Sequence, residues 1–498
     1  MKTTHIPSEL SGYLKGCRVT TSVLSDGLTL QSLTETTTAC YLFKENQRRR
    51  IFLLQTPQGE YFLKISTLIR RKDRLRHFVL PMRRDAEWRN LHRLRRMRID
   101  AARPIMKGHK NRHFFFIVTR GVCGKHPTCQ SIADARTLGR YLSRIHDKGV
   151  YHADLHPGNI ILQPGCRPCL IDAQEVFVLP HMPRWTRTHN LGALFHHLMA
   201  LGATGDWLHA LLVAYNEGVS VSVENSAVFE HCDYHRERRY ASRTKRACKN
   251  SSDFAIVSKG AVRGYKRKNF SWGPQEVQEA LKKGQWLKED RVLQYRGICI
   301  KVHTNRFFHK DRSLKAWKMS RALDVRGITV PKALAYFRMS GKSCFLSQLL
   351  VDGIRLNDYL SSMDNESQKR QAIRAFAEWM GKVHRHKMWQ RDFKSTNVLV
   401  QKENYFMLDQ ESVIPLRRLP SNRQRIINLA QLNASVSNAV SLKDRLRFFH
   451  HYAKDLPSPR HIRRKIYREI WAITETKQTG FFGLDIEKLG VSRKDSSS

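Results

Sequence analysis

Apolar residues along the chain fall into strand-like and helix-like segments that follow one another in a fixed order. Runs such as GEYFLKIST at 59–67 and RHFFFIVTR at 112–120 are typical of strands. They precede amphipathic segments such as ARTLGRYLSRIHDKG at 135–149, in which apolar residues recur at helical spacing. This order predicts an antiparallel sheet followed by a mainly helical region.

The same series then occurs a second time. RGICIKVHT at 296–304 and SCFLSQLLVDG at 343–353 match the two strands, and AIRAFAEWMGKVHRHK at 372–387 matches the helix. Matched order and spacing over about 230 residues predict a tandem duplication. The polar, basic and weakly periodic segment 216–246 predicts the boundary, so we expect one domain at 1–224 and a second at 225–498.

Composition favours a soluble, cytosolic protein. The chain has 498 residues and 41% hydrophobic residues, enough for two packed cores. No run approaches the roughly 18 apolar residues of a spanning helix, and the N-terminus lacks the apolar core of a signal peptide. Among ten cysteines, Cys166 and Cys169 form a CxxC near Cys123, Cys129 and His126. The tight hairpin expected there favours reduced structural thiols over a zinc site.

The formal net charge of +45 indicates an anionic partner surface. Phospholipid, an anionic glycolipid, nucleic acid and a polyphosphorylated substrate are the candidate classes. The densest basic run is IRRKDRLRHFVLPMRRDAEWRNLHRLRRMR at 69–98. No nucleic-acid-binding module is recognisable and no aromatic ladder interleaves with the basic runs, which argues against nucleic acid as the partner.

The first copy carries the side chains that phosphoryl transfer from ATP needs. Lys64 ends a predicted strand, Asp154 and Asn159 lie five residues apart in YHADLHPGNIIL, and Asp172 follows in CLIDAQEV. We expect Lys64 to bind the α- and β-phosphates and Glu87, on the next helix, to pair with it. Asp154 is the candidate base for the accepting hydroxyl, and Asn159 and Asp172 are the candidate Mg²⁺ ligands.

The second copy repeats this set 237 or 238 residues further along. Lys301 corresponds to the strand lysine and Asp392 to the candidate base. Asn397 and Asp409 correspond to the candidate Mg²⁺ ligands. Lys394, two residues after Asp392, is expected to reach the transferring phosphate.

These motifs resemble those of a known superfamily. HADLHPGNIIL with LIDAQEV, and RDFKSTNVLV with MLDQES, resemble the catalytic and metal loops of protein-kinase-like enzymes. With AEW at 86–88 and RGITVPKALAYF at 326–337, the chain is most similar to the lipopolysaccharide core heptose and Kdo kinase family. The resemblance implies two tandem protein-kinase-like bilobal domains of the α+β class, each with an antiparallel β N-lobe and a mainly α C-lobe. It also implies ATP with Mg²⁺, and a sugar hydroxyl acceptor on a membrane-anchored glycolipid.

The resemblance and the charge together indicate where in the cell the protein works. We expect a cytoplasmic enzyme, peripheral at the inner face of the inner membrane, that contacts inner-leaflet anionic phospholipid and the lipopolysaccharide core.

Several departures from the pattern keep alternatives open. Neither copy has a clear glycine-rich phosphate loop, and neither has Phe-Gly after Asp172 or Asp409. The second copy has Ala316 where the first has Glu87, so Lys301 lacks this carboxylate partner; the sequence leaves open whether one copy is degenerate or both are active. The alternatives are a non-catalytic pseudokinase scaffold and a protein kinase, although no regulated activation segment is visible.

Overall fold

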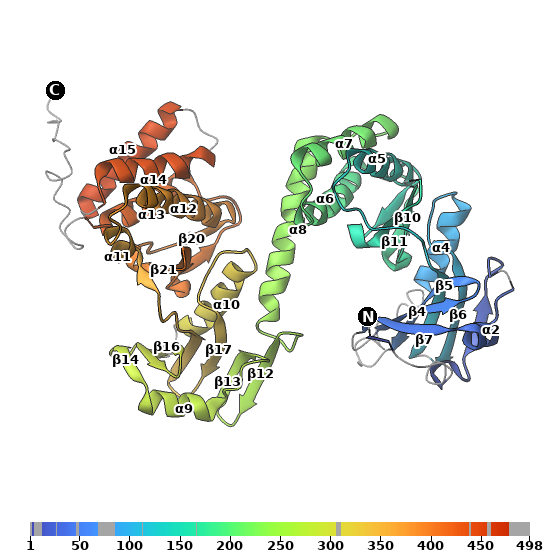
Figure 1. Cartoon of the computed structure of the whole chain (residues 1–498), viewed down its shortest axis with the longest axis horizontal. Coiled ribbons are helices and arrows are strands. Elements are labelled where there is room, and N and C mark those ends of the chain that lie inside the picture. Colours follow the sequence, from blue (N-terminus) through green and yellow to red (C-terminus); the bar gives the residue numbers. More distant parts are fainter. Residues whose placement is uncertain are drawn as a thin grey trace. The chain divides into compact units, whose positions relative to one another are not determined.

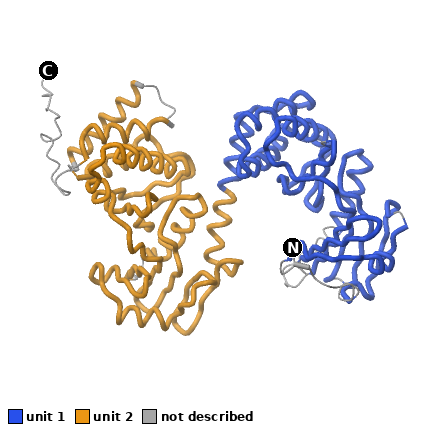
Figure 2. The backbone as a smooth tube through the Cα atoms, in the orientation of Figure 1, with its two compact units in different colours: residues 1–237 blue, residues 238–498 orange. Residues whose placement is uncertain are grey.

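The computed structural model divides the chain into two compact units, Met1–Glu237 and Arg238–Ser498 (Figure 2). The structure describes residues 2–3, 12–25, 27–45, 49–67, 85–111, 113–165, 167–304, 310–437, 440–455 and 460–477. The helix α8 (Asn225–Arg246) runs through the division between the units. The functional boundary near residue 225, at the start of this helix, stays a prediction.

The first unit begins with a seven-stranded antiparallel sheet (Figure 1). Its strand order is β1 (Lys2–Thr3), β3 (Ala39–Glu45), β4 (Arg49–Thr56), β5 (Gly59–Thr67), β7 (Phe114–Arg120), β6 (Pro104–Asn111) and β2 (Arg18–Thr21). One face is apolar and packs with the helix α2 (Leu30–Thr36). The turn between β4 and β5 falls at Pro57 and Gln58, inside the predicted TPQG hairpin.

The rest of the first unit is mainly helical. Its helices are α4 (Ala86–Arg96), α5 (Ile132–Asp147), α6 (Arg184–Ala200), α7 (Gly205–Gly218) and α8. The buried face of α5 has the predicted 3–4 spacing, and Ser131 caps its first turn by accepting a hydrogen bond from the Asp134 backbone N–H. At Gly139 the helices α5 and α7 lie so close that a Cβ would overlap the Leu211 carbonyl oxygen.

Two short antiparallel strand pairs carry the loops of interest in this unit. The strand β8 (Val150–His152) pairs with β11 (Val176–Val178), and β9 (Ile160–Gln163) pairs with β10 (Arg167–Leu170). The residues between β8 and β9 and those between β10 and β11 are therefore brought to the same end of the helical region.

The second unit repeats this architecture. Its sheet order is β12 (Phe254–Lys259), β13 (Val262–Arg267), β17 (Ala333–Arg338), β18 (Lys342–Gln348), β16 (Ile298–Thr304), β15 (Val292–Tyr295) and β14 (Gln285–Lys288). The run β14-β15-β16-β18-β17 matches β3-β4-β5-β7-β6 of the first unit strand for strand. Arg296 and Gly297, with φ of 47° and 74°, turn β15 into β16 at the predicted QYRG hairpin.

The helical part of the second unit matches as well. It contains α9 (Pro274–Lys283) and α10 (Arg312–Asp324) beside the sheet. It then contains α11 (Leu356–Ser361), α12 (Glu366–Arg385), α13 (Asn422–Ser435), α14 (Leu442–Tyr452) and α15 (Arg460–Lys477). The pairs β20 (Met388–Gln390) with β23 (Val413–Pro415), and β21 (Val398–Gln401) with β22 (Asn404–Met407), repeat those of the first unit, and β19 (Ile354–Arg355) adds to β21. The predicted fold, two tandem α+β bilobal units with antiparallel sheets, is confirmed. Among the helices that the structure describes, none is both long and apolar enough to cross a membrane.

A buried hydrogen-bond network connects three helices of the first unit to the end of β8. The His146 ring on α5 hydrogen-bonds the Tyr215 hydroxyl on α7 through Nδ1 at 2.9 Å and Asn190 Oδ1 on α6 through Nε2 at 3.2 Å. Asn190 Nδ2 in turn donates to the His152 carbonyl oxygen at 2.7 Å. The network therefore fixes the backbone two residues before Asp154.

The second unit contains the same network at corresponding positions. His384 on α12 hydrogen-bonds the Tyr452 hydroxyl at 2.7 Å and Asn428 Oδ1 at 3.2 Å. Asn428 Nδ2 donates to the Gln390 carbonyl oxygen at 2.6 Å, two residues before Asp392. The duplication thus extends to the buried polar contacts that hold the predicted catalytic loop.

These two histidines make the stability of the fold depend on pH. Burial lowers the pKa of His146 and that of His384 to about 3. The unfolded chain binds a proton at each position near pH 6.5, whereas the folded chain stays neutral there. Since the unfolded state binds more protons, the free energy of unfolding falls as the pH drops below about 6.5, by about 2 kcal/mol per histidine at pH 5.

We predict that His146→Gln reduces the loss of unfolding free energy between pH 7 and pH 5 by about 2 kcal/mol, because it removes one buried titratable ring. Urea unfolding at the two pH values measures this loss. The control His209→Gln, at an exposed position on α7, should leave it unchanged. A pH dependence equal to that of the wild type in His146→Gln would contradict the assignment.

Candidate active site

The strand lysine of the first unit meets a carboxylate from the following helix. On β5 the side chains of Tyr61, Leu63 and Ile65 are buried in the core of the sheet, so the alternation places Lys64 on the other face. There Lys64 Nζ forms an ion pair with the Glu87 carboxylate from the first turn of α4. The side chains are only 12% and 9% exposed. The expected contact between Lys64 and Glu87 is present, and a small cavity lies beside it.

Asp172 reaches the same lysine from the other lobe. It follows β10 with a left-handed backbone, φ 58°, and its Oδ1 lies 3.6 Å from Lys64 Nζ. Its Oδ2 lies 3.7 Å from Arg49 Nη1. Burial alone would raise the pKa of the Asp172 carboxyl, but the charges of Lys64 and Arg49 outweigh it and hold the pKa below its ordinary value. The carboxylate is therefore ionised at neutral pH.

The loop after β8 presents Asp154 to solvent. The Asp154 backbone N–H donates to His152 Nδ1 at 3.2 Å, and Asn159 Nδ2 donates to the Asp154 carbonyl oxygen at 2.9 Å. Burial lowers the pKa of His152 to about 4, so its ring is neutral and can accept this bond. The Asp154 side chain is 69% exposed, with His156 Nε2 at 3.8 Å from Oδ2. This leaves the carboxylate accessible to an incoming acceptor.

The second unit brings together the corresponding side chains. Asn397 Nδ2 donates to the Asp392 carbonyl oxygen at 2.9 Å, as Asn159 does in the first unit. The Asp392 side chain is 47% exposed, and Lys394 Nζ lies 3.1 Å from its Oδ1. Lys394 takes the place that His156 has beside Asp154, so in each unit a basic side chain lies next to the candidate base.

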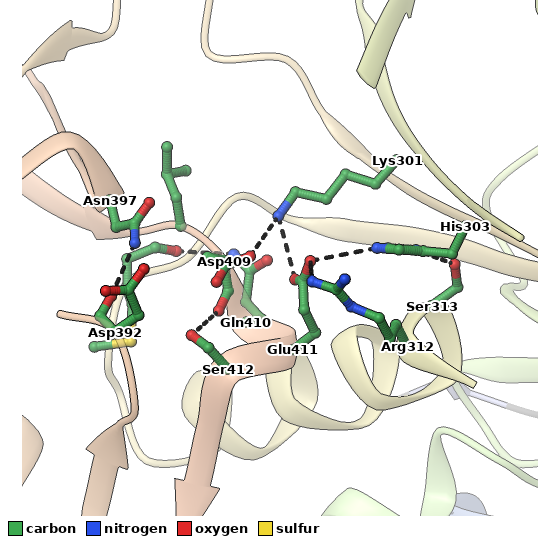
Figure 3. A network of polar contacts seen from close by, with 12 residues as sticks. Lys301, His303, Arg312, Ser313, Asp392, Asn397, Asp409, Gln410, Glu411 and Ser412 are labelled. Carbon is green, nitrogen blue, oxygen red and sulfur yellow. Dashed lines mark hydrogen bonds and ion pairs between the residues drawn. The ribbon is translucent and has the colours of Figure 1, made fainter. Parts of the chain in front are cut away.

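The expectation that Lys301 lacks a carboxylate partner is wrong. Ala316 is buried in α10, but Lys301 Nζ lies 3.2 Å from Glu411 Oε2 and 3.6 Å from Asp409 Oδ1 (Figure 3). The Glu411 side chain, 5% exposed, comes from the turn that follows Asp409. The ion pair is retained because the carboxylate comes from a loop instead of from the helix.

Neighbouring polar and charged groups keep Glu411 ionised despite its burial. His303 Nε2 lies 3.5 Å and Arg312 Nη2 3.7 Å from Glu411 Oε1 (Figure 3). Burial would raise the pKa of the Glu411 carboxyl, but His303 and Lys301 hold it well below its ordinary value. Burial and the neighbouring Glu411 charge raise the pKa of Asp409. The sequence contains one sign of this role for Glu411. The second copy has a carboxylate at this position, where the first copy has the neutral side chain of Gln174 in LIDAQEV.

The oxygen donors of both units fit Mg²⁺. Asn159 and Asn397 use their amide hydrogens to hold the loop, which leaves each Oδ1 to coordinate, and Asp172 and Asp409 add carboxylate oxygens. Mg²⁺ prefers such oxygens and takes one or two protein ligands when phosphates supply the rest. Within the described ranges, no group of three or more His, Cys, Asp and Glu side chains could hold a metal ion. The metal-binding roles stay proposals.

Of the CxxC pair, Cys169 is among the described residues and Cys166 lies outside them. Burial raises the pKa of Cys169 to about 12, so its thiol stays protonated at neutral pH and is a poor metal ligand. The hairpin expected at this pair is formed by β9 and β10.

In protein kinases a glycine-rich loop ahead of the lysine strand covers the nucleotide phosphates. In the second unit the β14–β15 connection is formed by Glu289, Asp290 and Arg291 and contains no glycine. In the first unit the β3–β4 connection, residues 46–48, lies outside the described residues. The glycine-free turn of the second unit departs from the usual pattern, in which backbone N–H groups of a glycine-rich loop bind the phosphates.

A two-lobed fold in which a strand lysine, a loop Asp–Asn pair and a strand-end Asp meet defines a kinase-like phosphotransferase. The chain belongs to the lipopolysaccharide kinase (Kdo/WaaP) family, whose model matches residues 41–215 in the first unit and 282–452 in the second. It is a kinase whose acceptor is a hydroxyl group. The suspected family is therefore confirmed, and one match falls in each unit.

Three solved structures are among those similar to parts of this chain. "WaaP in complex with acyl carrier protein" is 18% identical with a TM-score of 0.30, over 40% of this chain and 88% of that chain. An aminoglycoside-3'-phosphotransferase of type VIII is 16% identical with a TM-score of 0.32, over 42% and 97%. Spectinomycin phosphotransferase APH(9)-Ia, in complex with ADP and spectinomycin, is 12% identical with a TM-score of 0.28, over 43% and 82%. No curated protein matches the chain.

Because Lys64 and Glu87 are buried together, removing one should cost far more than removing both. We predict that Lys64→Met and Glu87→Leu each lower the unfolding free energy by about 3 kcal/mol, since each leaves a buried charge without its nearest counterion. The double variant should recover most of this loss, and a double-mutant cycle in urea measures the coupling.

The exposed pair Arg374 and Glu378 on α12 is the matched control, and its coupling should stay below about 1 kcal/mol. Additive losses at Lys64 and Glu87 would show that the two side chains do not interact in solution.

Proposed function

We propose that the protein is an ATP-dependent kinase that phosphorylates a sugar hydroxyl of lipopolysaccharide core or of a related surface glycolipid. The observation that carries this proposal is the repeated arrangement of a buried lysine–carboxylate pair beside an exposed loop aspartate. This arrangement occurs in each matched region of a lipopolysaccharide kinase family. It offers one cation for a nucleotide phosphate and one open carboxylate for an acceptor.

In the first unit the roles follow from exposure and charge. Lys64, held by Glu87, binds the α- and β-phosphates of ATP. Asp154, which is open to solvent, orients the accepting hydroxyl and takes its proton. Asn159 and Asp172 would hold Mg²⁺, which when bound neutralises charge on the phosphates.

In the second unit Lys301 binds the phosphates and Asp392 is the base. Asn397 and Asp409 would hold Mg²⁺. Lys394, already within 3.1 Å of Asp392, is placed to neutralise charge on the transferring phosphoryl group. The ion pair at Lys301 removes the main reason to regard the second copy as degenerate, so we propose that both copies turn over.

The competing proposal is a pseudokinase scaffold. One observation favours it, the glycine-free turn with Glu289 and Asp290 before the lysine strand, because two carboxylates there would repel phosphates. A scaffold would bind nucleotide or glycolipid without phosphoryl transfer to any acceptor, so turnover separates the two proposals.

We predict that transfer from γ-labelled ATP to lipopolysaccharide core falls by at least about 1,000-fold in the double variant Asp154→Asn/Asp392→Asn, because both general bases are lost. Each single variant should retain the turnover of the other unit. Glu378→Gln, on the exposed face of α12, serves as the control and should transfer like the wild type.

Equal transfer by the double variant and the wild type would refute the assignment of the bases. Binding of ATP without transfer to any glycolipid acceptor by the wild type would support the scaffold instead.

The net charge of +45 suggests that the enzyme works at an anionic membrane surface. Each Lys or Arg near such a surface contributes about 1 kcal/mol, and the attraction falls off within a Debye length. We predict co-sedimentation with vesicles that contain anionic phospholipid and none with neutral vesicles, weakening from about 0.1 M to about 0.5 M salt. Salt-independent binding, or equal binding to neutral vesicles, would contradict an electrostatic contact.

A further inference from the structure

We propose that Glu411 is the positioning residue for Lys301 and does in the second unit what Glu87 does in the first. The inference rests on the proposed function of the second unit as an ATP-dependent kinase. It assigns a role to a residue outside the usual lysine–helix-glutamate pair and explains how this unit keeps an ordered lysine.

The two copies differ by a complementary exchange of side chains. The first has Glu87 on its helix and Gln174 after its strand-end aspartate, whereas the second has Ala316 on its helix and Glu411 after its aspartate. Gln174 Oε1 accepts a hydrogen bond from Arg49 Nη2. The second copy therefore lacks the helix carboxylate of the first copy. It has instead a carboxylate after its strand-end aspartate, and this carboxylate reaches the corresponding lysine.

The helix α10 has no other carboxylate free to replace the missing one. Asp311, its N-cap, accepts hydrogen bonds from the Leu314 backbone N–H at 3.0 Å, from the Tyr336 hydroxyl at 2.6 Å and from the Ser343 hydroxyl at 2.9 Å. Asp324 lies at the far end of the helix, paired with Arg321. The helix instead contributes a cation, Arg312, to Glu411.

The two Glu411 oxygens have different partners. Oε2 lies 3.2 Å from Lys301 Nζ, while Oε1 lies 3.5 Å from His303 Nε2 and 3.7 Å from Arg312 Nη2. His303 is itself held through Nδ1, which hydrogen-bonds Ser313 Oγ at 2.8 Å. Contacts on both oxygens, in a side chain only 5% exposed, fix the orientation of the carboxylate toward Lys301 (Figure 3).

The element that supplies the carboxylate determines which part of the fold positions the lysine. In the first unit Glu87 belongs to α4, so the position of Lys64 depends on where α4 lies. In the second unit Glu411 belongs to the turn that also carries Asp409. Gln410 Nε2 donates to the Met407 carbonyl oxygen at 2.8 Å, and the Ser412 hydroxyl donates to the Asp409 carbonyl oxygen at 2.8 Å, which fixes this turn. One loop therefore positions both the lysine and the metal-site aspartate.

The test uses the full chain carrying Asp154→Asn, so that turnover reports the second unit. In this background we expect Glu411→Gln to raise the KM for ATP, to lower kcat, and to reduce kcat/KM by about 100-fold. Ala316→Glu, added to Glu411→Gln, restores a carboxylate from the helix and should recover at least about 10-fold of the loss. Glu411→Asp keeps the charge on a shorter side chain and should give an intermediate value.

The control Glu378→Gln should leave both kinetic constants unchanged, and thermal unfolding monitors the folding of each variant. Unchanged constants in Glu411→Gln would overturn the inference, while the proposed function would stand if Asp392→Asn still abolished turnover. Loss of activity that neither Ala316→Glu nor Glu411→Asp relieves would also overturn it, since the role would then be structural. Turnover that survives Asp392→Asn would instead refute the proposed function of this unit.

Discussion

A buried ammonium–carboxylate pair is the contact on which the rest of each candidate active site depends. Lys64 with Glu87, and Lys301 with Glu411, lie in surroundings that exclude most water. Removing either partner would leave the other, largely buried charge without its nearest counterion, which is costly, so the pair fixes the distance between its two elements. That contact connects the lysine strand to the elements beside it and leaves the lysine directed toward the strand-end aspartate, 3.6 Å away in each unit.

The two copies show that the buried lysine requires an opposite charge nearby, and that this charge need not come from one particular position in the fold. Both retain the same order of five strands and the same buried His–Tyr–Asn network behind the loop that carries the candidate base. They differ in which element supplies the carboxylate. Packing constrains the fold at many positions at once, whereas an ion pair requires only that an opposite charge reach the same point. A glutamate on a neighbouring turn therefore satisfies it as well as one on the helix.

Much of the fold could be predicted because it depends on local pattern. Alternation placed Lys64 and Lys301 on strands, and helical spacing predicted α5 and α12. Glu411 was missed because it is 110 residues from Lys301, and the left-handed backbone of Asp409, φ 54°, directs the turn that brings them together.

The buried His384 contacts depend in the same way on helices distant in sequence. The division of the compact units after Glu237, beyond the predicted boundary near residue 225, follows from α8, whose polar, basic sequence has too weak a periodicity to predict a continuous helix.

A crystal structure of the full chain with a non-hydrolysable ATP analogue and Mg²⁺ tests the central claim most directly. The account predicts nucleotide in each unit, with Lys64 and Lys301 hydrogen-bonded to its phosphates while still paired with Glu87 and Glu411. Nucleotide bound away from these lysines, or lysines turned away from these glutamates, would contradict it.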